Sequence, residues 1–112
     1  MDELLKNVKT FLSSASLVYN SQDYTSAAIL YFKTLFAVLD FIILKAYGKT
    51  PKDHQERLKM LQKEHIEFYV ILDKLLPLYQ DTYFSAIQKA KCDQVKYYVE
   101  QIIKQQSIPV SN

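Results

Sequence analysis

Apolar residues in this chain recur every three or four positions, a spacing that predicts amphipathic helices. The chain contains one glycine and three prolines, and this scarcity of turn-forming residues favours long helices over many short strands. Five segments carry the pattern: Asp2 to Tyr19, Tyr24 to Tyr47, Asp53 to about Lys63, a fourth from about Ile66, and a last one ending near Gln106. Between the last two, residues 84 to 92 fit either a loop or a helix.

The segment from Tyr24 to Tyr47 carries the strongest helical signal. Asp23 is a suitable N-cap residue, and Gly48, the only glycine, stands where a helix commonly ends. Apolar residues surround almost its whole circumference, which predicts a central, buried helix. Lys33 and Asp40 lie inside this apolar stretch, and because charges at the centre of a membrane span are costly, we do not expect a membrane helix.

The remaining boundaries complete a simple architecture. Asp53 followed by Glu56 forms a capping box for a short third helix. Pro77 falls inside the fourth segment and is expected to kink or split it. The sequence therefore predicts an all-α, up-and-down bundle of four to five helices, with one domain over residues 1–107 and a frayed tail over residues 108–112.

Composition and charge narrow the classes of function. A hydrophobic fraction of 49% can supply one core, and a net charge of +2 gives no strong attraction to nucleic acid or membranes. Cys92 is the only cysteine, so no disulfide can form within the chain, and we expect this thiol to be incidental. The first residues lack the pattern of a signal peptide, and we expect a cytoplasmic protein.

Two stretches of the chain resemble HEPN domains. Residues 22–28 and 31–40 resemble the second helix of that family, and Gly48-Lys49-Thr50-Pro51, followed by His54 and Arg57, resembles the loop and short helix that come next. The resemblance extends from about Leu4 to Ile103. It implies a helical bundle that pairs as a homodimer. Family members include ribonuclease toxins, RNA-processing modules and partners of small nucleotidyltransferases in toxin–antitoxin pairs.

The catalytic motif of that family is missing from this chain. Catalytic members carry an arginine with a histidine four to six residues beyond it, whereas Gln80 stands at the arginine position here and no histidine follows. Arg57 is the only arginine, and His65 lies eight residues after it. RNA cleavage without a metal needs a base for the 2′-hydroxyl and a cation for the phosphate. We therefore expect a non-catalytic member that uses no cofactor.

Two groups of residues are candidates for a binding groove. Lys33 and Asp40 are seven residues apart, hence nearly on the same side of the helix, where they form either a polar seam facing a cleft or a narrow strip facing solvent. The segment from Tyr79 to Tyr83 occupies the family's functional position and is either part of a groove or a polar turn after Pro77. The candidate groove residues are Lys33, Asp40, Tyr79, Gln80, Asp81 and Tyr83.

Three hypotheses for function stay open. The leading one is a HEPN-like binding module, as a homodimer contacting through Leu35 and Leu39 or with a nucleotidyltransferase partner, with RNA or a nucleotide as a further ligand. The resemblance also offers Tyr83 as one option for an acceptor in nucleotide transfer, the alternative being a packing role at the edge of the core. A second hypothesis is a divergent ribonuclease that uses Lys33, Asp81 and Tyr83. The third is a generic helical scaffold without a nucleotide ligand.

Other polar residues carry weaker signals. His54 follows the N-cap Asp53 and is expected to play a helix-start role. His54 and His65 have no cysteine or carboxylate at ligand spacing, so no metal site is predicted. A basic and aromatic cluster near the C-terminus forms either a solvated helix face or a weak nucleic-acid patch: Lys89, Lys91, Lys96, Tyr97 and Tyr98.

Overall fold

The computed structural model describes residues 2–110 and contains, within them, five helices and no strand. The helices are α1 (Asp2–Asn20), α2 (Tyr24–Tyr47), α3 (His54–Glu64), α4 (Ile66–Asp81) and α5 (Lys89–Gln105). The expected all-α bundle is therefore confirmed, and α2 has the bounds that its caps predict. A radius of gyration of 13.4 Å matches the value of about 13 Å expected for one compact domain of this length.

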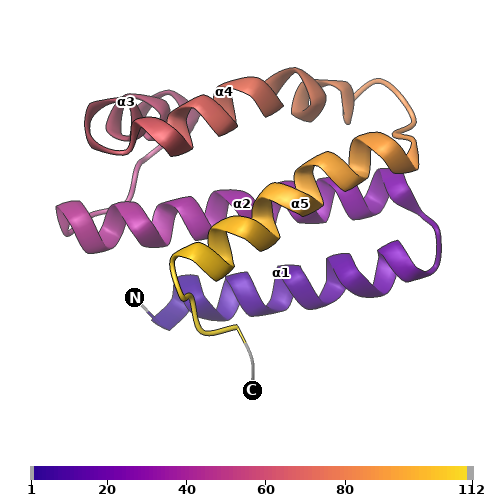
Figure 1. The fold of residues 1–112 in the computed structure, drawn as a ribbon, viewed down its shortest axis with the longest axis horizontal. Coiled ribbons are helices and arrows are strands. Elements are labelled where there is room, and N and C mark those ends of the chain that lie inside the picture. The colour runs from indigo at the N-terminus through magenta and orange to yellow at the C-terminus, as the bar shows by residue number, and fades with distance from the viewer. Residues whose placement is uncertain (1, 111–112) are drawn as a thin grey trace.

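Helix α2 is the centre of the bundle and contacts all four other helices. Figure 1 shows the α3–α4 pair along one side of α2, α1 along the opposite side, and α5 crossing in front of it. Asp23 accepts a hydrogen bond from the Ser26 amide, and Gly48 ends the helix with a φ of 76°. By length and composition α2 could cross a membrane, but 72% of its most apolar window is buried inside the bundle, as in the core helix of a soluble protein.

The burial of α2 corrects the expected dimer contacts. Leu35 is 0% exposed and Leu39 is 1% exposed within the single chain, so neither side chain is available to a second subunit. Helical spacing identifies them as buried, but it does not distinguish burial within a chain from burial between chains. Here the other helices of the same chain cover them.

Helix α4 and the segment after it differ from the sequence-based picture. Helix α4 runs without interruption through Pro77, so the proline does not split it. Pro77 and Asp73 are both exposed, and water can replace the hydrogen bond that the proline ring removes. The ambiguous region divides: residues 82–85 form a turn and bend, residues 86–88 are non-helical, and α5 begins at Lys89.

A tight turn after α5 brings part of the tail back onto the bundle. Ser107 has a φ of 52°, its amide donates to the Lys104 carbonyl, and the Ile108 amide donates to the Ile103 carbonyl. These two bonds form a Schellman motif in which a serine takes the place usual for glycine. Ile108 is only 6% exposed, so the frayed tail expected from this residue onward is wrong at Ile108 itself. Residues 111 and 112 lie outside the described residues.

Candidate functional site: a groove along α2

Two pockets open beside each other on α2 and share Lys33 and Phe36. The first, of about 240 Å³, lies between α2 and the α3–α4 pair and is lined by Ile29, Lys33, Phe36, His54, Tyr79, Thr82 and Tyr83. The second, of about 210 Å³, lies between α2 and α1 and is lined by Leu4, Asn7, Phe11, Lys33, Phe36, Ala37 and Asp40. We call the two pockets together the α2 groove.

A buried ion pair supports the floor of the groove. Arg57 Nε lies 2.7 Å from Asp40 Oδ1, and Arg57 Nη2 lies 3.0 Å from Asp40 Oδ2, so the guanidinium binds the carboxylate with two parallel hydrogen bonds. The two side chains are 9% and 16% exposed. The guanidinium carbon also lies 4.8 Å from the centre of the Phe36 ring. Such paired geometry is what allows two charges to stay buried.

The same arginine fixes the hydrogen-bonding role of His54. Arg57 Nη1 lies 2.6 Å from His54 Nδ1. Because a guanidinium only donates, Nδ1 must accept, and a neutral ring then carries its proton on Nε2. Partial burial and the positive charge of Arg57 lower the pKa of His54 below its usual value of 6.5. His54 therefore presents a neutral N–H donor.

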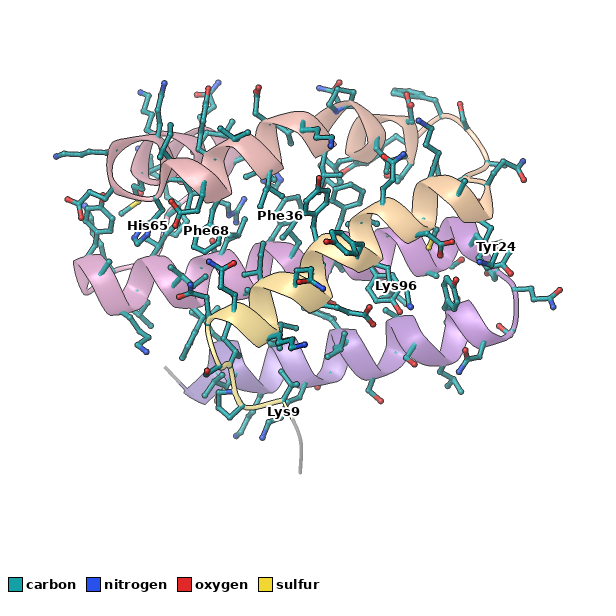
Figure 2. The ribbon with its side chains drawn as sticks, viewed as in Figure 1. Lys9, Tyr24, Phe36, His65, Phe68 and Lys96 are labelled. Carbon is teal, nitrogen blue, oxygen red and sulfur yellow. The ribbon has the colours of Figure 1, made fainter. Side chains whose placement is uncertain are left out.

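Aromatic rings form the wall of the groove. The Tyr79 ring packs edge-on against Phe36, with ring centres 5.1 Å apart, and lies 5.6 Å from His54. Figure 2 shows Phe36 at the middle of α2, in the layer between α2 and α4. The Tyr79 hydroxyl lies 2.9 Å from the hydroxyl of Tyr83. This hydrogen bond, with partial burial, raises the pKa of Tyr79 to about 12.

Lys33 supplies the positive charge at the mouth of the groove. Its side chain is exposed and its ammonium lies 6.0 Å from the centre of the Phe11 ring. Among the side chains that the structure describes, those of residues 3–110, no carboxylate forms an ion pair with it. Asp40 lies one helical turn after Phe36 on α2, and the charge of Arg57 neutralises it. Lys33 therefore gives this part of the surface a net positive charge.

The structure brings together four of the six candidate groove residues. Lys33, Tyr79 and Tyr83 line one pocket, and Asp40 lines the adjoining one. Gln80 and Asp81 are exposed on α4 and line neither pocket. The set of Lys33, Asp81 and Tyr83 considered for a ribonuclease is therefore not assembled in one pocket.

Sequence reasoning missed Phe36, His54 and Arg57 as parts of the groove. Phe36 belongs to the apolar pattern of the core helix, and the position of His54 after Asp53 predicts only a helix-start role. A signal for Arg57 did exist. Asp40 in an apolar helix requires a buried cationic partner, and the planar guanidinium of the single arginine is well suited to that role.

The other candidate positions do not form a competing site. The searched residues contain no cluster of three or more side chains able to hold a metal ion. Lys89 and Lys96 pair with Asp93 and Glu100 at 3.0 and 3.7 Å, which reduces the positive charge of the C-terminal cluster. Cys92 is fully buried, and burial raises its pKa to about 11, which keeps the thiol protonated.

Comparison of the chain with models of protein families, with curated proteins and with solved structures finds no match. The resemblance to HEPN domains therefore stays a hypothesis drawn from the residues of this chain.

Proposed function

We propose that this chain is a non-catalytic, HEPN-like binding module of the cytoplasm, which acts as a homodimer and holds a nucleotide or a segment of RNA in the α2 groove. The observation that carries the proposal is the chemistry of the groove. Lys33 and the Nε2–H of His54 supply donors, Phe36, Tyr79 and Tyr83 supply aromatic surface, and Arg57 neutralises the one carboxylate that lines it.

This chemistry suits a ligand that is both flat and anionic. The Tyr83 ring is 68% exposed and can stack on a base, while Lys33 faces a phosphate. A pocket of about 240 Å³ is smaller than most sites for drug-sized ligands, so it suits a single nucleotide unit. A longer strand would continue over the second pocket, which begins at the shared Lys33.

The hydrogen bonds of the groove favour binding over catalysis. His54 Nδ1 is occupied by Arg57, and all three nitrogens of that guanidinium already form hydrogen bonds with Asp40 or His54. Tyr79 is a poor base or nucleophile near neutral pH because its pKa is about 12. The ribonuclease hypothesis thus lacks both a free base and a free arginine.

The homodimer rests on the resemblance and on exposed apolar surface beside the groove. Phe84 is 88% exposed and Tyr83 is 68% exposed, and both follow α4 at the end of the groove. We propose the more exposed Phe84 as the dimer contact in place of Leu35 and Leu39, since Tyr83 lines the ligand pocket. A nucleotidyltransferase partner, which the resemblance also implies, would contact the same surface. Copurification of that enzyme, with a nucleotide attached to Tyr83, would identify the pairing.

The ligand can be tested by fluorescence anisotropy with a labelled oligoribonucleotide. Lys33→Glu should weaken binding roughly tenfold, whereas the control Lys91→Glu, on an exposed face of α5, should leave it nearly unchanged. Tyr83→Ala should weaken binding roughly tenfold through lost stacking, compared with the exposed control Tyr97→Ala. Equal effects of each variant and its control would refute the nucleotide ligand, and shortening of the RNA would favour the ribonuclease.

Light scattering tests the homodimer. Phe84→Asp should convert a dimer to a monomer, and Leu17→Asp, on the exposed face of α1 at 73% exposure, should not. A wild-type chain that stays monomeric at high concentration would refute this part of the proposal. If the chain is a monomer and still binds RNA, the proposed ligand stands and only the proposed homodimer is refuted.

A further inference from the structure

A third pocket, which shares no residue with the α2 groove, lies between α1 and α5. Both helices pack on α2, but within the described residues their backbones do not contact each other, and Figure 1 shows them diverging across α2. The space that they leave is a pocket of about 440 Å³, a volume in the range of small-molecule sites. We call it the α1–α5 pocket.

Both ends of the α1–α5 pocket are closed. At one end, the Tyr19 hydroxyl donates to Asp93 Oδ1 at 2.6 Å, which links α1 to α5. At the other end, Val110 lines the pocket, in the tail that the turn at Ser107 returns to the bundle. A helix of a partner protein would need open ends to lie between α1 and α5, so the pocket suits a small molecule.

The hydroxyl of Tyr31 is a polar group of this pocket that the fold leaves without a partner. Tyr31 lines the pocket and is only 1% exposed, and its hydroxyl forms no hydrogen bond within the described residues. Among the described side chains, His65 Nε2 is the only buried polar atom that lacks both a partner and accessible surface. The Tyr31 hydroxyl therefore keeps accessible surface, and it opens into the pocket that its ring lines.

The charges of the pocket largely cancel. Lys96 and Glu100 both line it, and their charged groups lie 3.7 Å apart. The Lys96 ammonium also lies 4.9 Å from the centre of the Tyr19 ring, and Figure 2 shows Lys96 reaching from α5 toward α1. Lys104, the remaining charged residue of the lining, is exposed to water, which screens its charge. The pocket therefore favours an uncharged ligand.

Tyr31 can donate a hydrogen bond to such a ligand. Burial, together with the negative charge of Glu100, raises the pKa of Tyr31 to about 12, so the hydroxyl keeps its proton near neutral pH. Buried polar groups in native folds nearly always have a partner. A hydroxyl that opens into an otherwise largely apolar pocket is complementary to a carbonyl oxygen, which only accepts.

We infer that the α1–α5 pocket binds a small, uncharged, apolar molecule that carries a carbonyl group. The carbonyl oxygen accepts a hydrogen bond from the Tyr31 hydroxyl, and the apolar body packs against Leu12, Ile103 and Val110. Benzene fills an apolar cavity of about 150 Å³ in another protein, so about 440 Å³ has room for a ring and a carbonyl group. The inference does not depend on the function proposed for the α2 groove.

The test is an NMR titration of the full chain with acetophenone, with ethylbenzene, which lacks the carbonyl oxygen, as the matched ligand. We expect acetophenone to cause saturable shifts of the amides around the pocket and to bind more tightly than ethylbenzene. Tyr31→Phe should weaken acetophenone binding roughly fivefold and leave ethylbenzene binding unchanged, because only the carbonyl bonds to the hydroxyl. Tyr97→Phe, at an exposed position of α5 outside the pocket, is the control and should change neither.

A second variant tests the place of binding. Ser16→Phe fills the pocket from an exposed position of α1 and should abolish the shifts, whereas Ser13→Phe, exposed on the same helix outside the pocket, should preserve them. Thermal melts check folding, and Tyr31→Phe should not lower the melting temperature, because its hydroxyl has no partner within the described residues. The inference is overturned if acetophenone causes no saturable shift, if ethylbenzene binds equally well, if Tyr31→Phe binds acetophenone as tightly as the wild type, or if the shifts persist in Ser16→Phe.

Discussion

The two histidines of this chain occupy opposite environments, although they stand only eleven positions apart. In the α2 groove, His54 accepts a hydrogen bond from Arg57, which in turn holds Asp40. At the junction of α3 and α4, His65 Nε2 is buried without any partner among the side chains that the structure describes. The first histidine belongs to a completed network, whereas the second leaves one hydrogen bond open. The environment of each ring, and not the residue type, therefore determines its role.

Because of this difference, the two regions contribute to the stability of the fold in different ways. A completed network of charges contributes to one rigid arrangement, and loss of a member is costly because it leaves the others buried and unpaired. A buried polar atom without a partner lowers stability. Substitutions in the two regions should therefore change stability in opposite directions.

The largest effect is expected from breaking the network at Arg57. Arg57→Met leaves the Asp40 carboxylate partly buried without its cation, and we expect the free energy of unfolding to fall by about 3–5 kcal/mol. Denaturant unfolding followed by circular dichroism measures this change.

The double variant Arg57→Met/Asp40→Leu is the control for that prediction. Removal of both charges should restore most of the lost stability, because no unpaired charge remains. A double variant as unstable as the single one would show that packing of the arginine side chain, and not the ion pair, supports this region.

The direct comparison is the same substitution at each histidine. His54→Phe removes the acceptor for Arg57 Nη1 and should cost about 1.5–3 kcal/mol, the range for hydrogen bonds to charged groups. His65→Phe keeps the ring stacked on Phe68 but removes the atom without a partner, and should raise the free energy of unfolding by about 1 kcal/mol. Thermal melts without added ligand measure both; a loss of stability at both positions would contradict the comparison.

A smaller effect is expected in the turn that packs Ile108 back onto the bundle. Ser107 adopts a φ of 52°, a conformation that costs a non-glycine residue about 1 kcal/mol, so Ser107→Gly should stabilise the chain by up to that amount. Gly48, with a φ of 76°, is the matched position, and Gly48→Ala should destabilise by about the same amount. Both changes in the free energy of unfolding can be measured by denaturant unfolding. If the two substitutions both stabilise or both destabilise the chain, this account is contradicted.

The smallest expected effect is a dependence of stability on pH that comes from His54. Its folded-state pKa lies below the unfolded value of 6.5, so the folded state favours the neutral ring. The contribution of His54 is complete above pH 6.5 and is lost as the pH falls through the folded-state pKa. The melting temperature should be lower at a pH below the folded-state pKa of His54 than at a pH above 6.5. His54→Gln should make this difference smaller.

The sequence predicts the helices well because their signals are local. Asp23 and Gly48 mark both ends of α2, and the apolar spacing within it identifies the central helix. Lys33, Tyr79 and Tyr83 line one pocket, and the sequence predicts this in part. In the sequence, each of the three residues stands in a polar part of an otherwise apolar helical segment, which makes it a candidate for a binding groove. Their meeting in one pocket depends on how α4 packs on α2, which periodicity does not specify.

The errors share a cause in tertiary structure. The sequence predicts that Leu35 and Leu39 contact a second subunit, yet the other helices of the same chain already cover both side chains. Ile108 is expected to begin a frayed tail, yet a turn at Ser107 returns it to the core. The gap at His65 Nε2 is also invisible in the sequence, since only the folded chain shows that no partner reaches it.

The separation of Asp40 from Arg57 has a consequence for synthesis of the chain. The two residues are 17 positions apart, so α2 leaves the ribosome before the arginine that neutralises its aspartate. During that interval α2 exposes an apolar helix long enough to cross a bilayer, and Lys33 and Asp40 are charges that disfavour its insertion by about 2.5–3.5 kcal/mol each at a helix centre. The charges of Lys33 and Asp40 thus disfavour insertion of α2 into a membrane before the other helices cover it, and a Lys33→Leu/Asp40→Leu chain should appear in the membrane fraction of expressing cells.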